Sequence, residues 1–369
     1  MKNNKTIVLG MSGGVDSSVC AYLLKKQGYK VIGVFMQNWD TVLNNDIKGH
    51  VANEDKQCNV YKDFSDAQAV GKLLGIEVYK VDFIKKYWDD VFLYLVKEYK
   101  AGRTPNPDVL CNKYIKFDSF IKYAKEKFNC DQIAMGHYAD IKVVGKKKCL
   151  ALSKDENKDQ TYFLCWLTQQ QIDKTTFPLG KLTKPEVRAI AKKAGLLNFN
   201  KKESTGVCFI GERKFQDFLK NYIKPKTGKI IDIVTKKIIG KHDGIMYYTI
   251  GQNKNLNLGG NDTKYYVCKR DAKNNILYVV DEKNRDKYLC STSCTLTNFN
   301  WINKTIPTNK NVFIRFRHRQ PLIKGKFVVK GKEVILTYPK FLAAAPGQFG
   351  VLYQKNICLG GGIIKDTNI

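Results

Sequence analysis

The stretch TIVLGMSGGVDSSVCAYLLKKQG, residues 6–28, joins an apolar run to a glycine turn and then to a helical pattern. The apolar run is typical of a buried strand, and the last part has the periodicity of a helix. Between them, the glycines and serines place backbone N–H groups and hydroxyls at a helix start, where anions bind readily. The order of strand, turn and helix predicts a phosphate-binding loop on a parallel sheet. A plain turn capped by serines is the alternative.

The same alternation continues to about residue 200. The apolar runs VIGVFM (31–36) and QIAMGH (132–137) alternate with helical patterns such as DFSDAQAVGKLLG (63–75). This pattern predicts an α/β fold, with helices on both faces of a parallel sheet and a ligand at the carboxyl ends of the strands. The polar segment 40–62 interrupts the pattern and is interpreted as a long loop over the site.

After about Thr205 the sequence changes to short β-type runs separated by turns. Examples are GKIIDIV (228–234), IMYYTIG (245–251) and KYYVCKRD (264–271), followed by a last block of alternating apolar and polar residues with Gly turns. Such a pattern is typical of small barrels and sandwiches. We therefore expect three domains: a catalytic α/β domain at 1–205, a small central β domain at 206–284, and a β-barrel at 285–369.

The charge balance indicates a polyanionic partner. Lys and Arg number 63 against 34 Asp and Glu, a net charge of +29 that is spread along the chain. Nucleic acid is the natural partner of such a surface, although a lysine-rich bias of the source genome would also produce it. The sequence contains no apolar run long enough to cross a membrane and starts directly with a strand, which predicts a soluble, cytoplasmic protein.

The 11 cysteines show no CxxC pair, so they are interpreted as reduced thiols of an intracellular protein. Cys290 and Cys294 are four residues apart, but without further ligands nearby they do not predict a metal site. Most of the others are expected to pack in apolar surroundings, and Cys58 lies in the polar loop. These packing cysteines are Cys20, Cys130, Cys149, Cys165, Cys268 and Cys358.

Two cysteines stand in more informative contexts. GRTPNPDVLCNKYIKF (102–117) has two prolines that fix an extended approach to Cys111, which we expect at a helix N-terminus, where the dipole would favour a thiolate. ESTGVCFIGERKF (203–215) surrounds Cys208 with small residues, as suits a thiol that must move. A buried structural cysteine after a proline turn is the alternative for Cys111.

The loop is neither a Walker loop nor a dinucleotide-binding loop, because the required lysine and glycine spacings are missing. Asp16 within it would repel phosphate unless it capped the helix or faced a metal, and Mg²⁺ is the simplest expectation. The loop resembles the SGGxDS motif of enzymes that cleave ATP between its α and β phosphates. That group includes GMP synthetase, argininosuccinate synthetase, lysidine synthetase and the tRNA thiolases.

The whole chain resembles one branch of this group, the bacterial-type tRNA-specific 2-thiouridylases. The strings MSGGVDSSV, FMQNWD, GRTPNPDVLCNKYIKF, AMGHYA, KDQTYFL, STGVCFIGER and APGQ occur in the order that the family shows. The resemblance implies an adenine-nucleotide hydrolase-like first domain. It also implies an enzyme that adenylylates the carbon 2 oxygen of the wobble uridine (position 34) and replaces that oxygen with sulfur.

The resemblance also assigns roles to individual residues. Cys208 would carry the sulfur as a persulfide, Cys111 would be the second catalytic thiol and form a disulfide with it, and Asp108 would be a general acid or base, with helix capping as a compatible alternative. A route through free hydrosulfide remains open. The ATP-binding residues would be Gly10, Met11, Ser12, Gly13, Gly14, Val15, Asp16, Ser17, Met36 and Gly136.

The implied tRNA contacts come from five motifs. They would be Asn106, Pro107, Asp108, His137, Lys158, Asp159, Gln160, Arg317, His318 and Gln348. Structural hydrogen bonding is the alternative for His137, and a solvated loop is the alternative for residues 158–160. Independently, the alternation in RFRHRQ (315–320) predicts a cationic stripe of Arg315, Arg317 and Arg319 on one strand face.

The expected reactants are ATP with Mg²⁺, tRNA with Glu, Gln and Lys acceptors, and a persulfide donor, either a cysteine desulfurase or a relay protein. No tightly bound metal, prosthetic group or membrane is expected. Two rivals differ in function class. An ATP-dependent ligase for a small molecule would need neither Cys111 nor Cys208, and a tRNA-binding protein with a vestigial loop would bind RNA without using ATP.

Overall fold

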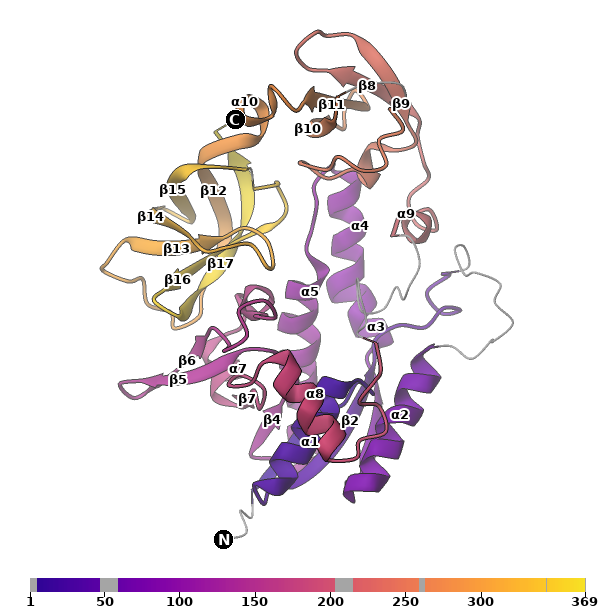
Figure 1. The fold of residues 1–369 in the computed structure, drawn as a ribbon, viewed down its shortest axis with the longest axis vertical. Coiled ribbons are helices and arrows are strands. Elements are labelled where there is room, and N and C mark those ends of the chain that lie inside the picture. Colours follow the sequence, from indigo (N-terminus) through magenta and orange to yellow (C-terminus); the bar gives the residue numbers. More distant parts are fainter. Residues whose placement is uncertain (1–4, 47–58, 203–214, 259–262, 343, 369) are drawn as a thin grey trace.

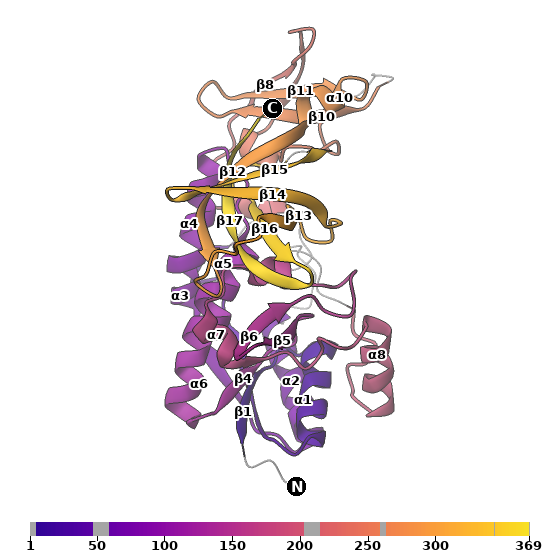
Figure 2. The same ribbon diagram turned by 90° about the vertical axis from the view of Figure 1, so that its left-hand side faces the viewer.

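The computed structural model describes residues 5–46, 59–202, 215–258, 263–342 and 344–368. Three sheets and their helices are stacked along the longest axis of the molecule (Figures 1 and 2). The parallel sheet lies at one end, a barrel in the middle and a small four-stranded sheet at the other end. The predicted class, an α/β unit followed by β units, is confirmed.

The parallel sheet has the strand order β3-β2-β1-β4-β7. Its strands are β1 (Thr6–Gly10), β2 (Lys30–Gln37), β3 (Val78–Asp82), β4 (Gln132–Ala134) and β7 (Thr175–Thr176). Because β2 follows β1 on one side while β4 lies on the other, the chain order reverses between β1 and β4. In open α/β sheets, ligands bind at the carboxyl ends of the strands at such a point.

Alternate residues of β1 face two different apolar layers, as the pleat of a strand requires. Ile7 and Leu9 pack with α1 (Val15–Lys26), α2 (Asn59–Leu74) and α8 (Lys184–Lys193). Val8 belongs to the opposite layer, together with residues of the helices between β3 and β4. The prediction that helices cover both faces is therefore confirmed.

Two long helical segments connect β3 to β4. The first consists of α3 (Ile84–Tyr87), a π-helical stretch (Trp88–Phe92) and α4 (Leu93–Lys100). The second consists of α5 (Pro107–Leu110), a π-helical stretch (Cys111–Ser119) and α6 (Phe120–Phe128). The π-helical backbone is uncommon and frequently marks functional sites, and here it begins at Cys111. Figure 1 shows α4 reaching toward the small sheet.

The small sheet has the order β10-β11-β8-β9. Its elements are β8 (Gly228–Asp232), β9 (Ile238–His242), β10 (Tyr265–Asp271) and β11 (Ile276–Asp281), preceded by α9 (Phe215–Leu219). The expectation of a strand at 245–251 is wrong. Ile245–Tyr247 is a 3-10 turn whose N–H groups are satisfied locally, such as Tyr247 N–H to the Gly244 carbonyl at 3.1 Å.

The barrel closes through the pairing of β12 with both β15 and β17. After α10 (Arg285–Leu289), its strands are β12 (Cys290–Trp301), β13 (Asn311–Arg315), β14 (Ile323–Lys330), β15 (Glu333–Leu342), β16 (Phe349–Gln354) and β17 (Ile357–Thr367). The hairpin of β5 (Asp140–Val144) and β6 (Lys147–Ala151), expected within the first domain, adds to this sheet where Ala151 pairs with Ile357.

Two short helical elements lie between β6 and β7. They are a 3-10 turn at Thr161–Leu164 and α7 (Gln169–Asp173). The expected loop at 40–62 is only partly observed, since α2 already begins at Asn59 and residues 47–58 lie outside the described part. Within the described residues, no helix has both the length and the apolar character needed to cross a membrane.

Candidate active site

The glycine loop follows β1 and ends at the first turn of α1, as predicted. The side chains of Met11 and Val15 are 1% and 5% exposed, so they belong to the core and offer only their backbone to a ligand. Ser12 and Ser17 face each other, with their hydroxyl oxygens 3.3 Å apart. The first N–H groups of α1 have no acceptor within the helix, which makes this turn suited to an anion.

Gly13 is required by both its backbone and its surroundings. Its φ is +71°, which disfavours residues with a Cβ, and a Cβ there would lie 2.1 Å from the Asp63 carbonyl oxygen. The loop therefore packs directly on α2. Gly14 is less constrained, because a Cβ there would meet only the Ser12 hydroxyl, at 3.4 Å.

The structure brings the remaining predicted nucleotide-pocket residues to this loop. A Cβ on Gly10 would lie 3.1 Å from the Met36 methyl group, and a Cβ on Gly136 would lie 3.3 Å from the Ser17 backbone nitrogen. These residues come from the ends of β1, β2 and β4, on both sides of the point where the chain order reverses. They therefore lie close together at the carboxyl edge of the sheet.

Asp16 is neutralised by the protein itself. Lys184 Nζ lies 2.7 and 2.9 Å from its two carboxylate oxygens, and the Tyr138 hydroxyl donates to one of them at 3.0 Å. The expected conflict between this carboxylate and phosphate is therefore relieved by a lysine. Mg²⁺ is usually held by one or two carboxylates together with phosphates, and at Asp16 it would have to share the carboxylate with Lys184, which already contacts both oxygens.

The sequence did not reveal the residues that donate hydrogen bonds to the glycine loop. Asn198 Nδ2 donates to the Gly13 carbonyl at 3.0 Å and to the Ser18 hydroxyl at 2.9 Å, and Lys201 Nζ reaches the same carbonyl at 3.2 Å. Lys201 also pairs with Asp63 of α2 at 2.7 Å. The sequence signals a helix at 184–193 through its capping box, but gives no sign that the chain after it returns to the loop.

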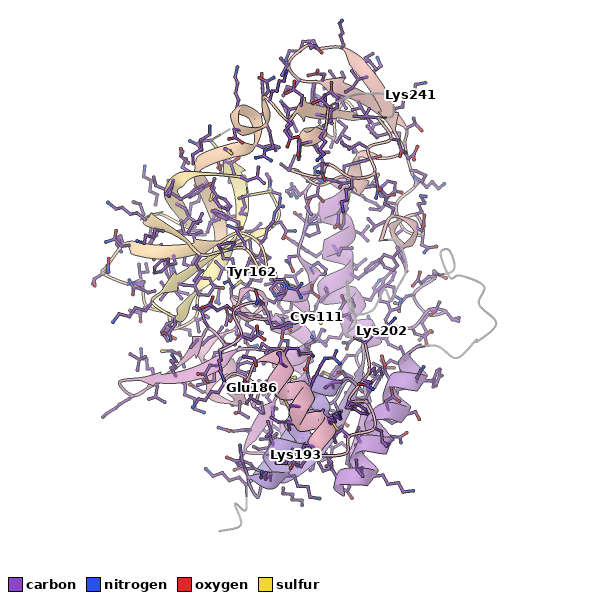
Figure 3. The ribbon with its side chains drawn as sticks, in the orientation of Figure 1. Cys111, Tyr162, Glu186, Lys193, Lys202 and Lys241 are labelled. Atoms are coloured by element: carbon purple, nitrogen blue, oxygen red, sulfur yellow. The ribbon has the colours of Figure 1, made fainter. Side chains whose placement is uncertain are left out.

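Cys111 is 1% exposed and lies in the interior of a helix rather than at its N-terminus. Asn106 caps that helix by accepting from the Val109 N–H at 3.3 Å, and Pro107 is the first helical residue. The expected dipole contact is therefore wrong, because the exposed N–H groups lie one turn earlier. In Figure 3, Cys111 lies between the α/β sheet and the barrel, near Tyr162.

Asp108 is half-buried on the first turn of this helix. Burial raises the pKa of its carboxyl group, and the charge of Lys116 partly opposes this shift. A carboxyl group with a raised pKa exchanges protons closer to neutral pH, as general acid or base chemistry requires.

His137 follows β4 and packs between Phe117 and Phe177, with ring centroids 5.6 and 6.2 Å away. Its Nδ1 is buried and has no hydrogen-bond partner among the described residues. Burial, with a smaller contribution from Lys116, holds the pKa of the imidazole well below its ordinary value. Because Phe117 is six residues after Cys111, this contact places the cysteine helix beside the end of β4.

Residues 158–160 are built into the structure rather than forming a solvated loop. Asp159 is 2% exposed and accepts from Arg315 at 2.9 Å, from the Ser153 N–H at 2.9 Å and from the Thr161 hydroxyl at 2.6 Å. Gln160 accepts from the Tyr138 N–H at 2.9 Å. In this conformation the Asp159 side chain supports the segment and does not face solvent.

The expected cationic stripe is wrong. Arg315 is buried against Asp159, and β13 ends there, so the next residues do not continue the alternation. Arg317 is exposed but donates to the Ile250 carbonyl at 3.0 Å, and Arg319 has a left-handed φ of +63°. His318 lies on Phe163 with ring centroids 4.6 Å apart.

The lowered pKa of His318 predicts that the fold loses stability in acid. Burial, then the charges of Arg319 and Arg315, lower its pKa from 6.5 to about 4. Between these values the unfolded chain binds more protons, so stability falls as the pH drops from 6.5 toward 4. We expect His318→Gln to recover up to about 2 kcal/mol of unfolding free energy at pH 4.5 and little at pH 7. Urea unfolding at both pH values measures this, and an unchanged pH dependence would contradict it.

Gln348 is placed against the cysteine segment. Its Nε2 donates to the Thr104 and Pro105 carbonyls at 2.9 and 3.3 Å, and its Oε1 accepts from Asn106 at 3.3 Å. The barrel thus holds the approach to Cys111 directly. Cys208 and Cys58 lie outside the described residues, so the Cys111 to Cys208 pairing stays a prediction. No cluster of three His, Cys, Asp or Glu suited to a metal occurs in the described part of the chain.

Comparison with known proteins matches three stretches of the chain to described families. Residues 5–212 match the tRNA methyl transferase HUP domain, 216–281 its PRC-barrel domain, and 291–364 the aminomethyltransferase beta-barrel domain. Two relatives are named tRNA-specific 2-thiouridylase MnmA. That of Ureaplasma parvum serovar 3 is 51% identical and covers 100% of this chain and 96% of its own length. That of Malacoplasma penetrans is 52% identical, covering 98% and 99%.

Similarity to solved structures is more distant. The NMN synthetase of Francisella tularensis aligns with 55% of this chain and 67% of its own, at 19% identity and a TM-score of 0.32.

Proposed function

The chain belongs to the tRNA-specific 2-thiouridylase family, and from this premise we propose that it is a tRNA-uridine 2-sulfurtransferase. It replaces the carbon 2 oxygen of the wobble uridine with sulfur and uses ATP to do so. The observation that carries the proposal is that the glycine loop, Gly136 and the helix of Cys111 meet at the carboxyl ends of β1 and β4. A small-molecule ligase is not favoured by relatives that span the whole chain.

We propose that the loop residues 10–17, with Met36 and Gly136, bind ATP. The uridine oxygen attacks the α phosphate, pyrophosphate leaves, and the oxygen becomes part of an AMP ester. This step is needed because an oxide ion is a poor leaving group, whereas AMP is a good one. Where Mg²⁺ accompanies ATP, Asp16 would share it, and the ion would neutralise phosphate charge.

Sulfur enters in the second step. The terminal sulfur of a Cys208 persulfide attacks carbon 2, and AMP leaves with the oxygen. The Cys111 thiolate then attacks Sγ of Cys208, so that the persulfide bond breaks, sulfur stays on the base and a Cys111–Cys208 disulfide forms. Two electrons from an outside reductant restore both thiols. Attack by free hydrosulfide is the alternative within the same scheme.

Asp108 is proposed as the group that moves the proton at the reacting base, with Asn106 and Pro107 completing that contact. Its raised pKa and its position on the helix of Cys111 support this role. We also propose that His137, Lys158, Gln160, Arg317 and His318 lie along the bound tRNA. The engaged Asp159 and Gln348 act there by holding their segments in place.

The high positive charge supplies affinity for the tRNA backbone, and the target base leaves its stack to reach the buried site. Glu-, Gln- and Lys-accepting tRNAs are the proposed substrates, in the cytoplasm. A cysteine desulfurase or a relay protein is the proposed sulfur donor.

The test uses an unmodified Glu-accepting tRNA, ATP and a persulfide donor, with thiolated tRNA detected by its retardation in a mercury-containing gel. A retarded band that requires ATP is expected. If no band forms while ATP is consumed with a small acceptor, the thiolation proposal is wrong and the ligase takes its place.

Asn198→Leu tests the support of the ATP loop. The change removes both hydrogen bonds to the loop while keeping similar volume, so we expect the KM for ATP to rise about tenfold with a smaller change in kcat. Asn303→Leu is the matched control, because Asn303 is a partly buried asparagine bonded to Cys149, remote from the loop. An unchanged KM for ATP in Asn198→Leu would contradict the supporting role.

A further inference from the structure

The segment between α4 and α5 is held by all three parts of the molecule at one residue, Thr104. Thr104 is 6% exposed. Its hydroxyl accepts from Arg270 Nη2 at 2.9 Å, its carbonyl accepts from Gln348 at 2.9 Å, and its N–H donates to the Pro346 carbonyl at 3.1 Å. Arg270 comes from β10 of the small sheet, and Gln348 and Pro346 precede β16 of the barrel.

Arg270 is an unusual group to find at such a junction. Its second described hydrogen bond runs from Nη1 to the Tyr248 carbonyl at 2.8 Å, so both bonds go to uncharged oxygens. Burial lowers the pKa of its guanidinium to about 10, which leaves the group charged at neutral pH. Arg270 is half-buried, and withdrawing even part of a cation from water against neutral partners is costly. The arginine therefore calls for a role beyond packing.

The chain after Thr104 is stiff. Residues 105–107 read Pro-Asn-Pro, and each proline fixes its own φ. Pro107 is already the first residue of the helix that carries Asp108 and Cys111. A displacement of Thr104 is therefore passed on to that helix, because the intervening residues have little freedom to absorb it.

We propose that Arg270 is a positioning residue for the thiolation reaction, setting Asp108 and Cys111 through its hydrogen bond to Thr104. This inference rests on the proposed function. It makes the small sheet, which contains no proposed reacting group, part of the catalytic geometry. Binding of tRNA to the basic small sheet would then change the position of the helix that carries Cys111.

The pair Thr104→Val and Thr104→Ser tests the bond with minimal change of volume. Valine removes the acceptor, and serine keeps it. We expect Thr104→Val to lower kcat for thiolation about 10- to 100-fold, the range for a hydrogen bond from a charged donor, with the Kd for tRNA changed less than about twofold. Thr104→Ser should keep kcat within about threefold of wild type.

Arg270→Met and the double variant complete the cycle. If the two side chains act through one bond, Arg270→Met with Thr104→Val loses no more activity than the worse single variant. A kcat for Thr104→Val equal to wild type, or losses that multiply, would overturn the positioning role. If Arg270→Met does not fold, the comparison of Thr104→Val with Thr104→Ser tests the positioning role by itself. Failure of the wild type to thiolate tRNA would instead overturn the proposed function itself.

Discussion

Cys111→Ser is expected to reduce thiolation of tRNA at least about 1,000-fold while the fold and the affinity for ATP are retained. Serine has nearly the same volume as cysteine but is not ionised near neutral pH, so it cannot attack Cys208 to release the sulfur. The side chain is 1% exposed and sits where the cysteine helix passes between the α/β sheet and the barrel. Cys208→Ser should be equally inactive, because it removes the proposed sulfur carrier.

Cys130→Ser is the matched control, since Cys130 is a partly buried cysteine between α6 and β4. It should keep nearly full activity in the same gel-retardation assay. Cys111→Ser with more than about a tenth of wild-type kcat would remove Cys111 from the reaction and favour a route through free hydrosulfide.

Gly13→Ala is expected to raise the Kd for ATP about 100-fold or to abolish ATP binding. Alanine at this position would combine two penalties, a left-handed φ of +71° and a Cβ that falls 2.1 Å from the Asp63 carbonyl oxygen. The φ alone costs about 1–2 kcal/mol, and the overlap forces the loop away from α2 or distorts the peptide that faces the ligand. Titration calorimetry with ATP measures the change.

Gly145→Ala separates these two penalties. Gly145 has a φ of +61°, but a Cβ there meets nothing within 4 Å. In this variant the positive φ has a similar free-energy cost, but in the hairpin of β5 and β6. The variant should therefore bind ATP as the wild type does. Equal ATP affinity in Gly13→Ala and the wild type would show that the loop does not hold the nucleotide.

The parts that the sequence predicted well depend on local pattern. The run TIVLGM and the glycine turn after it require a strand and a helix start, because no other local structure buries those side chains and satisfies that backbone. The pattern also predicts which strand ends meet, since parallel strands share one carboxyl edge. The family resemblance, rather than this pattern, assigned Met36 and Gly136 to the nucleotide pocket, and the structure places both beside the loop.

The parts that the sequence did not predict depend on contacts between distant segments. Nothing local distinguishes Lys184 from other lysines, yet the path of α8 brings it onto Asp16. The alternation in the sequence predicted that Arg315 is one of three surface arginines, whereas its side chain pairs with the buried Asp159. The helix of Cys111 began earlier than expected because Asn106 and Pro107 already form its cap and first turn.

The most direct test of the account is to follow the α phosphate of labelled ATP while unmodified Glu-accepting tRNA is thiolated by the wild-type enzyme. The account predicts 2-thiouridine at position 34 with one AMP and one pyrophosphate released for each sulfur transferred. Formation of ADP, thiolation without ATP, or sulfur placed at another nucleotide would contradict it.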